Sequence, residues 1–91
     1  MIQVMDDGNV DHDNEHVRNA DTVRWDADPT ADLDVTFDDP DVKGLVRGCG
    51  RNCRELILPC MDHPQGKPLK YTTAVTKNGK TKTRDPIIIW K

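Results

Sequence analysis

The sequence predicts an all-β protein, a small antiparallel β-sandwich of six to seven short strands in one domain that spans residues 1–91. Three observations lead to this prediction. Apolar and polar residues alternate in several short segments, as they do in strands with one buried face. Val, Ile and Thr are common, whereas only four residues are aromatic. Six prolines and six glycines separate the segments as turn residues.

The first half of the chain contains three predicted strands. Residues 2–5 alternate weakly and end at the turn cluster Asp6-Asp7-Gly8-Asn9. Residues 22–26 alternate more clearly, with a valine and a tryptophan on one face. Residues 32–37 show the clearest period of two, with three apolar residues on one face and polar residues on the other. Each of these segments is expected to be a half-buried strand.

The second half begins with a long cysteine-containing loop. Residues 40–53 are irregular and carry three glycines, and residues 55–58 form a short apolar run before a proline. Residues 69–76 alternate again and lead to Asn78-Gly79, a dipeptide typical of tight hairpin turns because both positions need a positive φ. After a polar return arm, residues 87–90 are apolar on both faces and predict a strand buried at the centre of a sheet.

Charge is distributed unevenly along the chain. Residues 1–42 hold thirteen acidic residues against two arginines, a net charge of −11, and residues 43–91 hold eleven lysines and arginines against three acidic residues, a net charge of +8. One interpretation is that interleaved strands bring the two halves together, so that the charges neutralise one another. The other is an acidic surface for a basic partner, with a separate basic patch for an anion.

All three cysteines lie in one short segment. Cys49, Cys53 and Cys60 are followed by His63 in the pattern C-x3-C-x6-C-x2-H. Three alternatives fit this pattern: a structural zinc ion held by three thiolates and the imidazole, one disulfide with a spare thiol, or reduced cysteines in a loop. The spacing does not decide between them, because it differs from the paired C-x2-C spacing of common zinc sites.

Several functional classes have no support in the sequence. There is no serine, no nucleotide-binding glycine pattern and no nucleophile motif, so we expect a protein that is not an enzyme. No apolar run approaches the ~18–20 residues that a membrane span needs, and the first residues lack a basic leader. We therefore expect a cytoplasmic protein. Nucleic-acid binding is not expected, because the net charge is −3 and the lysines of the last hairpin suit an exposed sheet edge.

The order of four segments resembles small bacterial cupredoxin-like, or Ig-like, β-sandwich proteins. The segments are DTVRW, LDVTF, KYTTAV and the closing DPIIIW, and together they cover about residues 20–40 and 69–90. The blue-copper members of this fold have a histidine just before the strand that corresponds to LDVTF. Here that position reads Pro29-Thr30-Ala31-Asp32. The resemblance therefore implies the sandwich without copper, because a blue-copper site needs two imidazoles.

Together these features suggest a non-enzymatic binding or accessory module that acts through a protein–protein interface. The first candidate for the contact surface is an acidic face made of Asp32, Asp34, Asp38, Asp39 and Asp41. One alternative is a zinc-binding or thiol-redox protein that uses the cysteine segment. Another is an acidic inhibitor that competes with nucleic acid for a basic partner. The sequence does not identify the partner or the oligomeric state.

Overall fold

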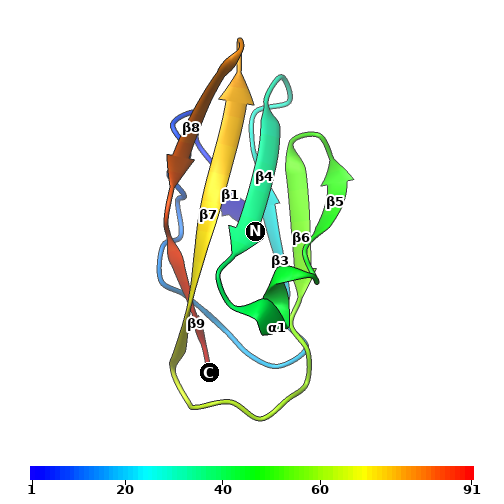
Figure 1. Ribbon diagram of the computed structural model, residues 1–91, viewed down its shortest axis with the longest axis vertical. Coiled ribbons are helices and arrows are strands. Elements are labelled where there is room, and N and C mark those ends of the chain that lie inside the picture. Colours follow the sequence, from blue (N-terminus) through cyan, green and yellow to red (C-terminus); the bar gives the residue numbers. More distant parts are fainter.

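The computed structural model describes residues 1–91 and contains nine strands and a single helical turn (Figure 1). The strands form two sheets. In the first sheet the order is β1 (Ile2–Gln3), β3 (Thr22–Asp26), β6 (Cys53–Ile57) and β5 (Arg47–Gly50). In the second sheet the order is β2 (Glu15–Val17), β9 (Ile87–Trp90), β7 (Lys67–Lys77) and β4 (Asp32–Phe37), and β8 (Lys80–Arg84) also pairs with β7. The helical turn, α1, spans Pro40–Lys43.

The all-β prediction is confirmed, but the prediction of antiparallel sheets is too simple. Both sheets are mixed, because β1 pairs parallel with β3 and β2 pairs parallel with β9. All other pairs are antiparallel. The two parallel pairs both use a very short strand from the N-terminal segment. An alternating pattern reports which face of a strand is buried and carries no information on the direction of its neighbour.

Two strands were not predicted. β2 lies in a polar segment and pairs with β9, and β5 lies in the segment 40–53 that the sequence predicts to be irregular. All four residues of β5 are exposed, so β5 has no buried face that could produce an alternating pattern. The helical turn α1 also lies in this segment. Its signal was present in the sequence, because Asp39 caps the turn by accepting a hydrogen bond from the Asp41 amide and Pro40 occupies the first position.

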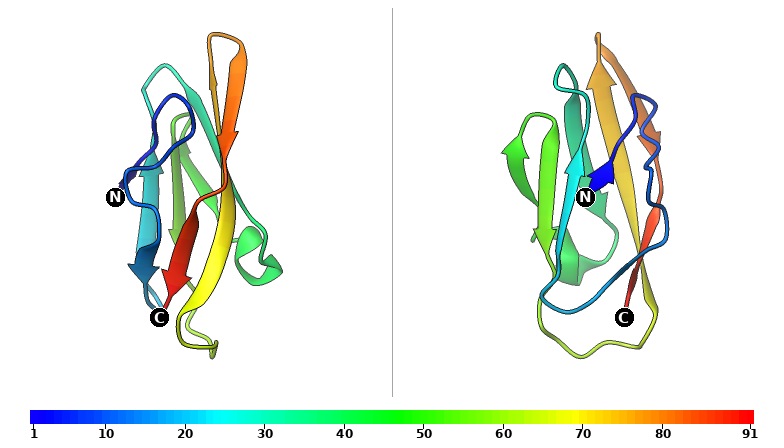
Figure 2. Two further views of the ribbon diagram at one scale, coloured as in Figure 1. Left: turned by 90° about the vertical axis from the view of Figure 1, so that its left-hand side faces the viewer. Right: turned by 180° about the vertical axis from the view of Figure 1, so that it is seen from behind.

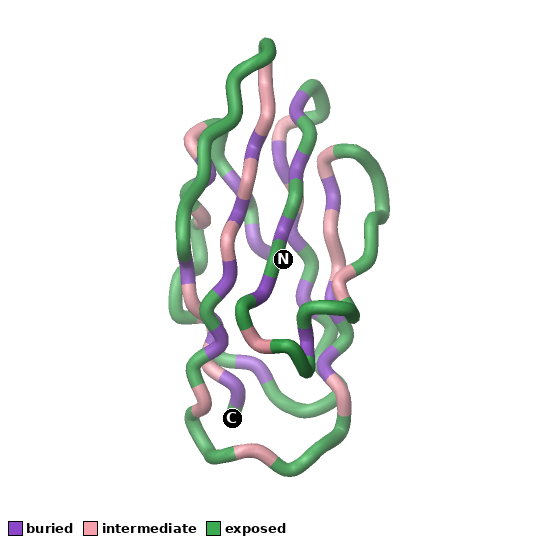
Figure 3. The backbone as a smooth tube through the Cα atoms, viewed as in Figure 1, coloured by how far each residue is buried: buried purple, intermediate pink, exposed green.

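The two sheets pack face to face on one core of buried apolar side chains (Figure 3). Its centre is a group of three aromatic residues, Trp25 from β3, Phe37 from β4 and Tyr71 from β7. The ring centroids lie 5.0–5.8 Å apart, within the range of favourable aromatic pairs. The Trp25 indole N–H donates a hydrogen bond of 3.2 Å to the Tyr71 hydroxyl, which joins the two sheets through a buried polar contact.

The long strand β7 organises the second sheet. It pairs with β4 along one side, and with β9 and then β8 along the other. The β7–β8 turn is the predicted one, since Asn78 and Gly79 have φ of 55° and 74°. Asp85 and Pro86 separate β8 from β9. The β7–β8 hairpin extends beyond the rest of the sheet at one end of the molecule, which measures 42 × 21 × 20 Å (Figure 2).

The acidic and basic halves of the chain neutralise each other across the fold, as the first interpretation predicts. Six of the nine ion pairs join residues 1–42 to residues 43–91. These pairs are Lys77–Asp6, Lys77–Asp28, Arg84–Asp7, Arg51–Asp32, Arg54–Asp34 and Lys67–Asp39. The structure contains no helix long and apolar enough to cross a membrane.

Candidate functional site

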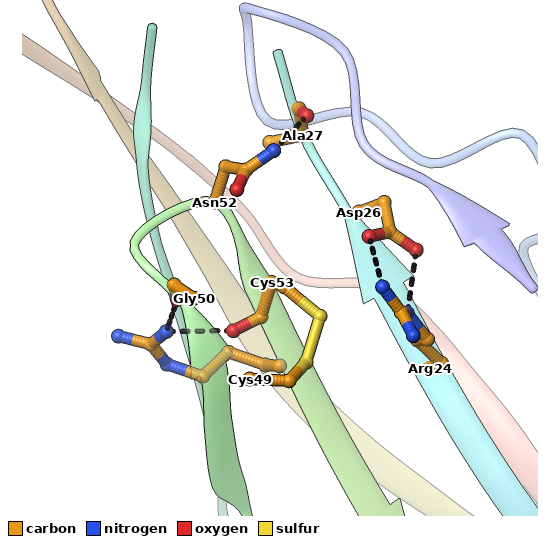
Figure 4. Close-up of a disulfide and its surroundings, with 8 residues drawn as sticks. Arg24, Asp26, Ala27, Cys49, Gly50, Asn52 and Cys53 are labelled. Carbon is orange, nitrogen blue, oxygen red and sulfur yellow. Dashed lines mark hydrogen bonds and ion pairs between the residues drawn. A yellow bond between two sulfur atoms is a disulfide. The ribbon is translucent and has the colours of Figure 1, made fainter. Parts of the chain in front are cut away.

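Cys49 and Cys53 form a disulfide between the neighbouring strands β5 and β6 (Figure 4). Their Cα atoms lie 5.1 Å apart, and the turn that joins the two strands lies between them. Cys53 is buried, whereas Cys49 is exposed. Of the three alternatives for the cysteines, the structure therefore has the disulfide with a spare thiol. In this form Cys49 and Cys53 have no thiolate to offer a metal.

Hydrogen bonds hold the turn between the two cysteines on both sides. The Arg54 guanidinium donates to the carbonyl oxygens of Gly50 (2.8 Å) and Cys53 (2.7 Å). The Asn52 amide group donates to the Ala27 carbonyl (2.9 Å), and the Ala27 amide returns a hydrogen bond to the Asn52 carbonyl (2.8 Å). The disulfide and Arg54 therefore hold the β5–β6 hairpin together, and Asn52 connects its turn to the loop that follows β3.

The other two predicted zinc ligands lie on the long connection between β6 and β7. Cys60 is an exposed free thiol. The His63 ring stacks on Trp90, with ring centroids 4.0 Å apart, and its Nδ1 lies 3.0 Å from the Pro64 carbonyl oxygen. The structure does not bring Cys49, Cys53, Cys60 and His63 together, and no group of three or more His, Cys, Asp or Glu residues is arranged to hold a metal.

The five aspartates of the predicted acidic face lie on two consecutive parts of the chain. Asp32 and Asp34 lie on the outer side of β4, and Asp38, Asp39 and Asp41 lie around α1. Asp32 accepts two hydrogen bonds from the Arg51 guanidinium, and Asp34 lies 3.9 Å from that of Arg54. The Lys67 ammonium, 2.7 Å from Asp39, and the hydrogen bond from the Asp41 amide lower the pKa of Asp39. Asp38 and Asp41 are exposed.

Small residues cover the outer side of β4, β7 and β8. The strand registers place Asp32, Thr76 and Thr81 in one row across the three strands, and Asp34, Ala74 and Thr83 in the next. A hydrogen bond of 2.7 Å joins the Thr76 and Thr81 hydroxyls within the first row. We call this surface the threonine face and define it by Thr36, Thr72, Ala74, Thr76, Thr81 and Thr83.

The threonine face was not among the sequence predictions, although its signal was present. Each of its residues occupies an outward position of an alternating segment, and threonine is well suited to an exposed sheet surface. A shallow hollow borders the face, lined mainly by the charged side chains of Asp32, Asp34, Arg51 and Arg54. The face and this charged border offer hydroxyl groups and partly paired charges to whatever contacts them.

No family model matches the chain, and no curated protein matches it.

Proposed function

We propose that the protein is a non-enzymatic binding module whose contact surface is the threonine face, with Asp32 and Asp34 on its border. The observation that carries the proposal is that three strands build this outer surface from small residues, none of which is buried. Small side chains let a partner approach closely, and charged groups at a border set orientation and specificity. Because the face has no large aromatic or arginine anchor, the partner supplies the large side chains.

We also propose that the fold is Ig-like. The order β1-β3-β6-β5 corresponds to strands A-B-E-D of an immunoglobulin constant-type domain, and β4-β7-β9 corresponds to C-F-G. This correspondence supports an Ig-like arrangement. Two features depart from it: β1 is parallel to β3, and the disulfide joins neighbouring strands of one sheet instead of joining the two sheets.

A thiol-redox function is the second candidate, and the disulfide favours it. Cys49 is exposed, so a thiolate of another molecule can reach its sulfur.

The disulfide also bears on the cellular compartment of the protein, because disulfides persist in oxidising environments and are rare in the cytosol. We propose that an oxidising compartment suits this chain better than the cytoplasm that the sequence predicts. Alkylation of the protein directly in its native cells tests this: one reactive thiol supports an oxidising compartment, and three support the cytoplasm.

The binding function is tested by cross-linking the protein to its partners in native cells and capturing the products. The comparison is between two variants, each with a substitution on the outer surface of one sheet. Ala74→Arg places a large charged side chain in the middle of the threonine face. Ile57→Arg places the same side chain on the other sheet, where Ile57 is already 54% exposed. We expect the Ile57→Arg protein to capture the same partner as the wild type and the Ala74→Arg protein to lose it.

A second pair of substitutions tests the charged border. Reversal of charge at Asp32 and Asp34 should weaken capture if the border contributes to recognition.

Equal capture by the wild-type and Ala74→Arg proteins would exclude the threonine face as the contact surface. Failure of the wild type to capture any partner would count against the binding function itself.

A further inference from the structure

The outer edge of β8 is a sheet edge with unused hydrogen-bonding groups. β8 pairs with β7 on one side only, and Figure 1 shows it on the side of β7 away from β4. A two-residue turn makes Lys77 and Lys80 a hydrogen-bonded pair, so the hydrogen-bonded residues of β8 are Lys80, Lys82 and Arg84. The backbone N–H and C=O groups of Thr81 and Thr83 therefore point away from the sheet. The Thr83 carbonyl accepts a hydrogen bond of 2.9 Å from the Arg84 guanidinium, and no hydrogen bond uses the Thr83 amide or the Thr81 backbone groups.

The long edge strands β4 and β5 are blocked. On β4, the Leu33 amide donates to the Arg51 carbonyl (2.7 Å) and the Val35 amide donates to the Asp34 carboxylate (3.0 Å). On β5, the register shifts between Gly48 and Gly50, and such a bulge interferes with pairing by a further strand. The edge strands β1 and β2 have only two and three residues. β8, with five residues, is the longest edge that can accept another strand.

The charges beside this edge select the kind of strand that it can accept. Lys80 and Lys82 are exposed and form no ion pair, whereas the neighbouring cations are paired, Lys77 with Asp6 and Asp28 and Arg84 with Asp7. Because side chains alternate along a strand, Lys80 and Lys82 project to the same side, and Thr81 projects to the threonine face. Lys80 and Lys82 line a hollow at the hairpin tip together with Asp6, Lys77 and Asn78.

We propose that the edge of β8 binds an extended acidic segment of a partner protein, which adds to the second sheet as a further strand. Its backbone pairs with both Thr81 groups and with the Thr83 amide, and carboxylates at alternate positions lie beside Lys80 and Lys82. The same lysines disfavour addition of a second copy of β8, since like charges on adjacent strands repel. This proposal rests on the proposed binding function and deepens it by naming the chemical class of the partner.

The test uses the full chain and two short labelled peptides, one that alternates glutamate with valine and one that alternates lysine with valine. Thr83→Pro removes an amide that the fold does not use, and proline is tolerated where a strand N–H faces solvent. Thr83→Val is the matched control because it keeps the amide. We expect the wild-type and Thr83→Val proteins to bind the glutamate peptide and the Thr83→Pro protein to bind it about tenfold more weakly, the loss of roughly one good hydrogen bond.

A second set of variants tests the charges. Lys80→Gln combined with Lys82→Gln should weaken binding of the glutamate peptide severalfold, and added salt should weaken binding to the wild type. Lys43→Gln, a substitution of an exposed lysine on α1, should leave binding unchanged. If Thr83→Pro prevents folding, hydrogen exchange on the wild type replaces it. Bound glutamate peptide should then protect the Thr81 and Thr83 amides.

Four results would overturn the proposal: no binding of the glutamate peptide, equal binding of the two peptides, equal binding by the Thr83→Pro and Thr83→Val proteins, or no protection of the Thr81 and Thr83 amides. Concentration-dependent protection of these amides without peptide would identify a second copy as the occupant and would also overturn it. A native partner that is lost from Ala74→Arg but kept by Thr83→Pro would leave the binding function intact and reject only strand addition at β8.

Discussion

Reduction of the Cys49–Cys53 disulfide should lower the free energy of unfolding by about 2 kcal/mol. The two cysteines are four positions apart, so the bond closes a very short loop. The chain-entropy relation gives ~2 kcal/mol for a loop of about five residues, less than the ~3 kcal/mol for a loop of about fifteen. For a chain of this size, such a loss corresponds to a fall in melting temperature of roughly 10 °C.

Urea unfolding followed by tryptophan fluorescence, with and without a phosphine reductant, measures this loss. The measurement is made on the Cys60→Ala protein, whose remaining cysteines are those of the disulfide, so the reductant acts on one bond only. The oxidised Cys60→Ala protein should match the oxidised wild type, because Cys60 is exposed. Identical midpoints for the oxidised and reduced protein would refute the reasoning and would mean that the hydrogen bonds of Arg54 hold the turn without help from the disulfide.

Three further predictions test the core, an exposed carboxylate and the N-terminal turn. Tyr71→Phe leaves the buried Trp25 indole N–H without its acceptor and should cost about 1–2 kcal/mol in urea unfolding. Hydrogen bonds from a nearby threonine lower the pKa of Asp28 to about 2 from 3.8. Stability from this carboxylate should therefore be complete above about pH 4 and lost as the pH falls toward 2, and urea midpoints of the Asp28→Asn protein should lack this component. Gly8→Ala should destabilise more than Gly66→Ala, as measured by urea unfolding. Both glycines have positive φ, but only at Gly8 does a new Cβ lie 3.3 Å from the β8 backbone.

The sequence predicts some strands to the residue and misses others for a clear reason. Residues 22–26, 32–37 and 87–90 are strands with the predicted boundaries. Each has a buried side that leaves an apolar pattern, and a proline or turn residue stands next to it. β2 depends mainly on pairing with β9, which is distant in the sequence. β5 depends mainly on pairing with β6 across a turn where the register shifts. β5 buries no residue and β2 buries only Val17, so neither has an alternating pattern that sequence periodicity can detect.

The candidate site was less predictable than the fold, because its chemistry depends on long-range neighbours. The spacing of the cysteines is compatible with both a metal and a disulfide, and the hairpin that places Cys49 beside Cys53 decides between them. His63 stacks on Trp90, which lies far along the chain from the cysteine segment. Asp32 lies in an acidic segment of the sequence, but in the fold it faces Arg51. A count of charges along the chain cannot show which of them are already paired.

The N-terminal segment gives an internal example of the contact that we propose for β8. In Figure 2 the N-terminal segment lies beside the β7–β8 hairpin. Asp6 pairs with Lys77 and Asp7 with Arg84, and the Thr73 hydroxyl donates a hydrogen bond of 2.6 Å to the Gly8 carbonyl. An acidic stretch thus already neutralises the cations at the inner side of this hairpin. The cations that form no ion pair, Lys80 and Lys82, lie on β8, whose outer edge also carries unpaired backbone groups. An acidic strand of another chain would pair its carboxylates with Lys80 and Lys82 and its backbone with the unpaired backbone groups of β8.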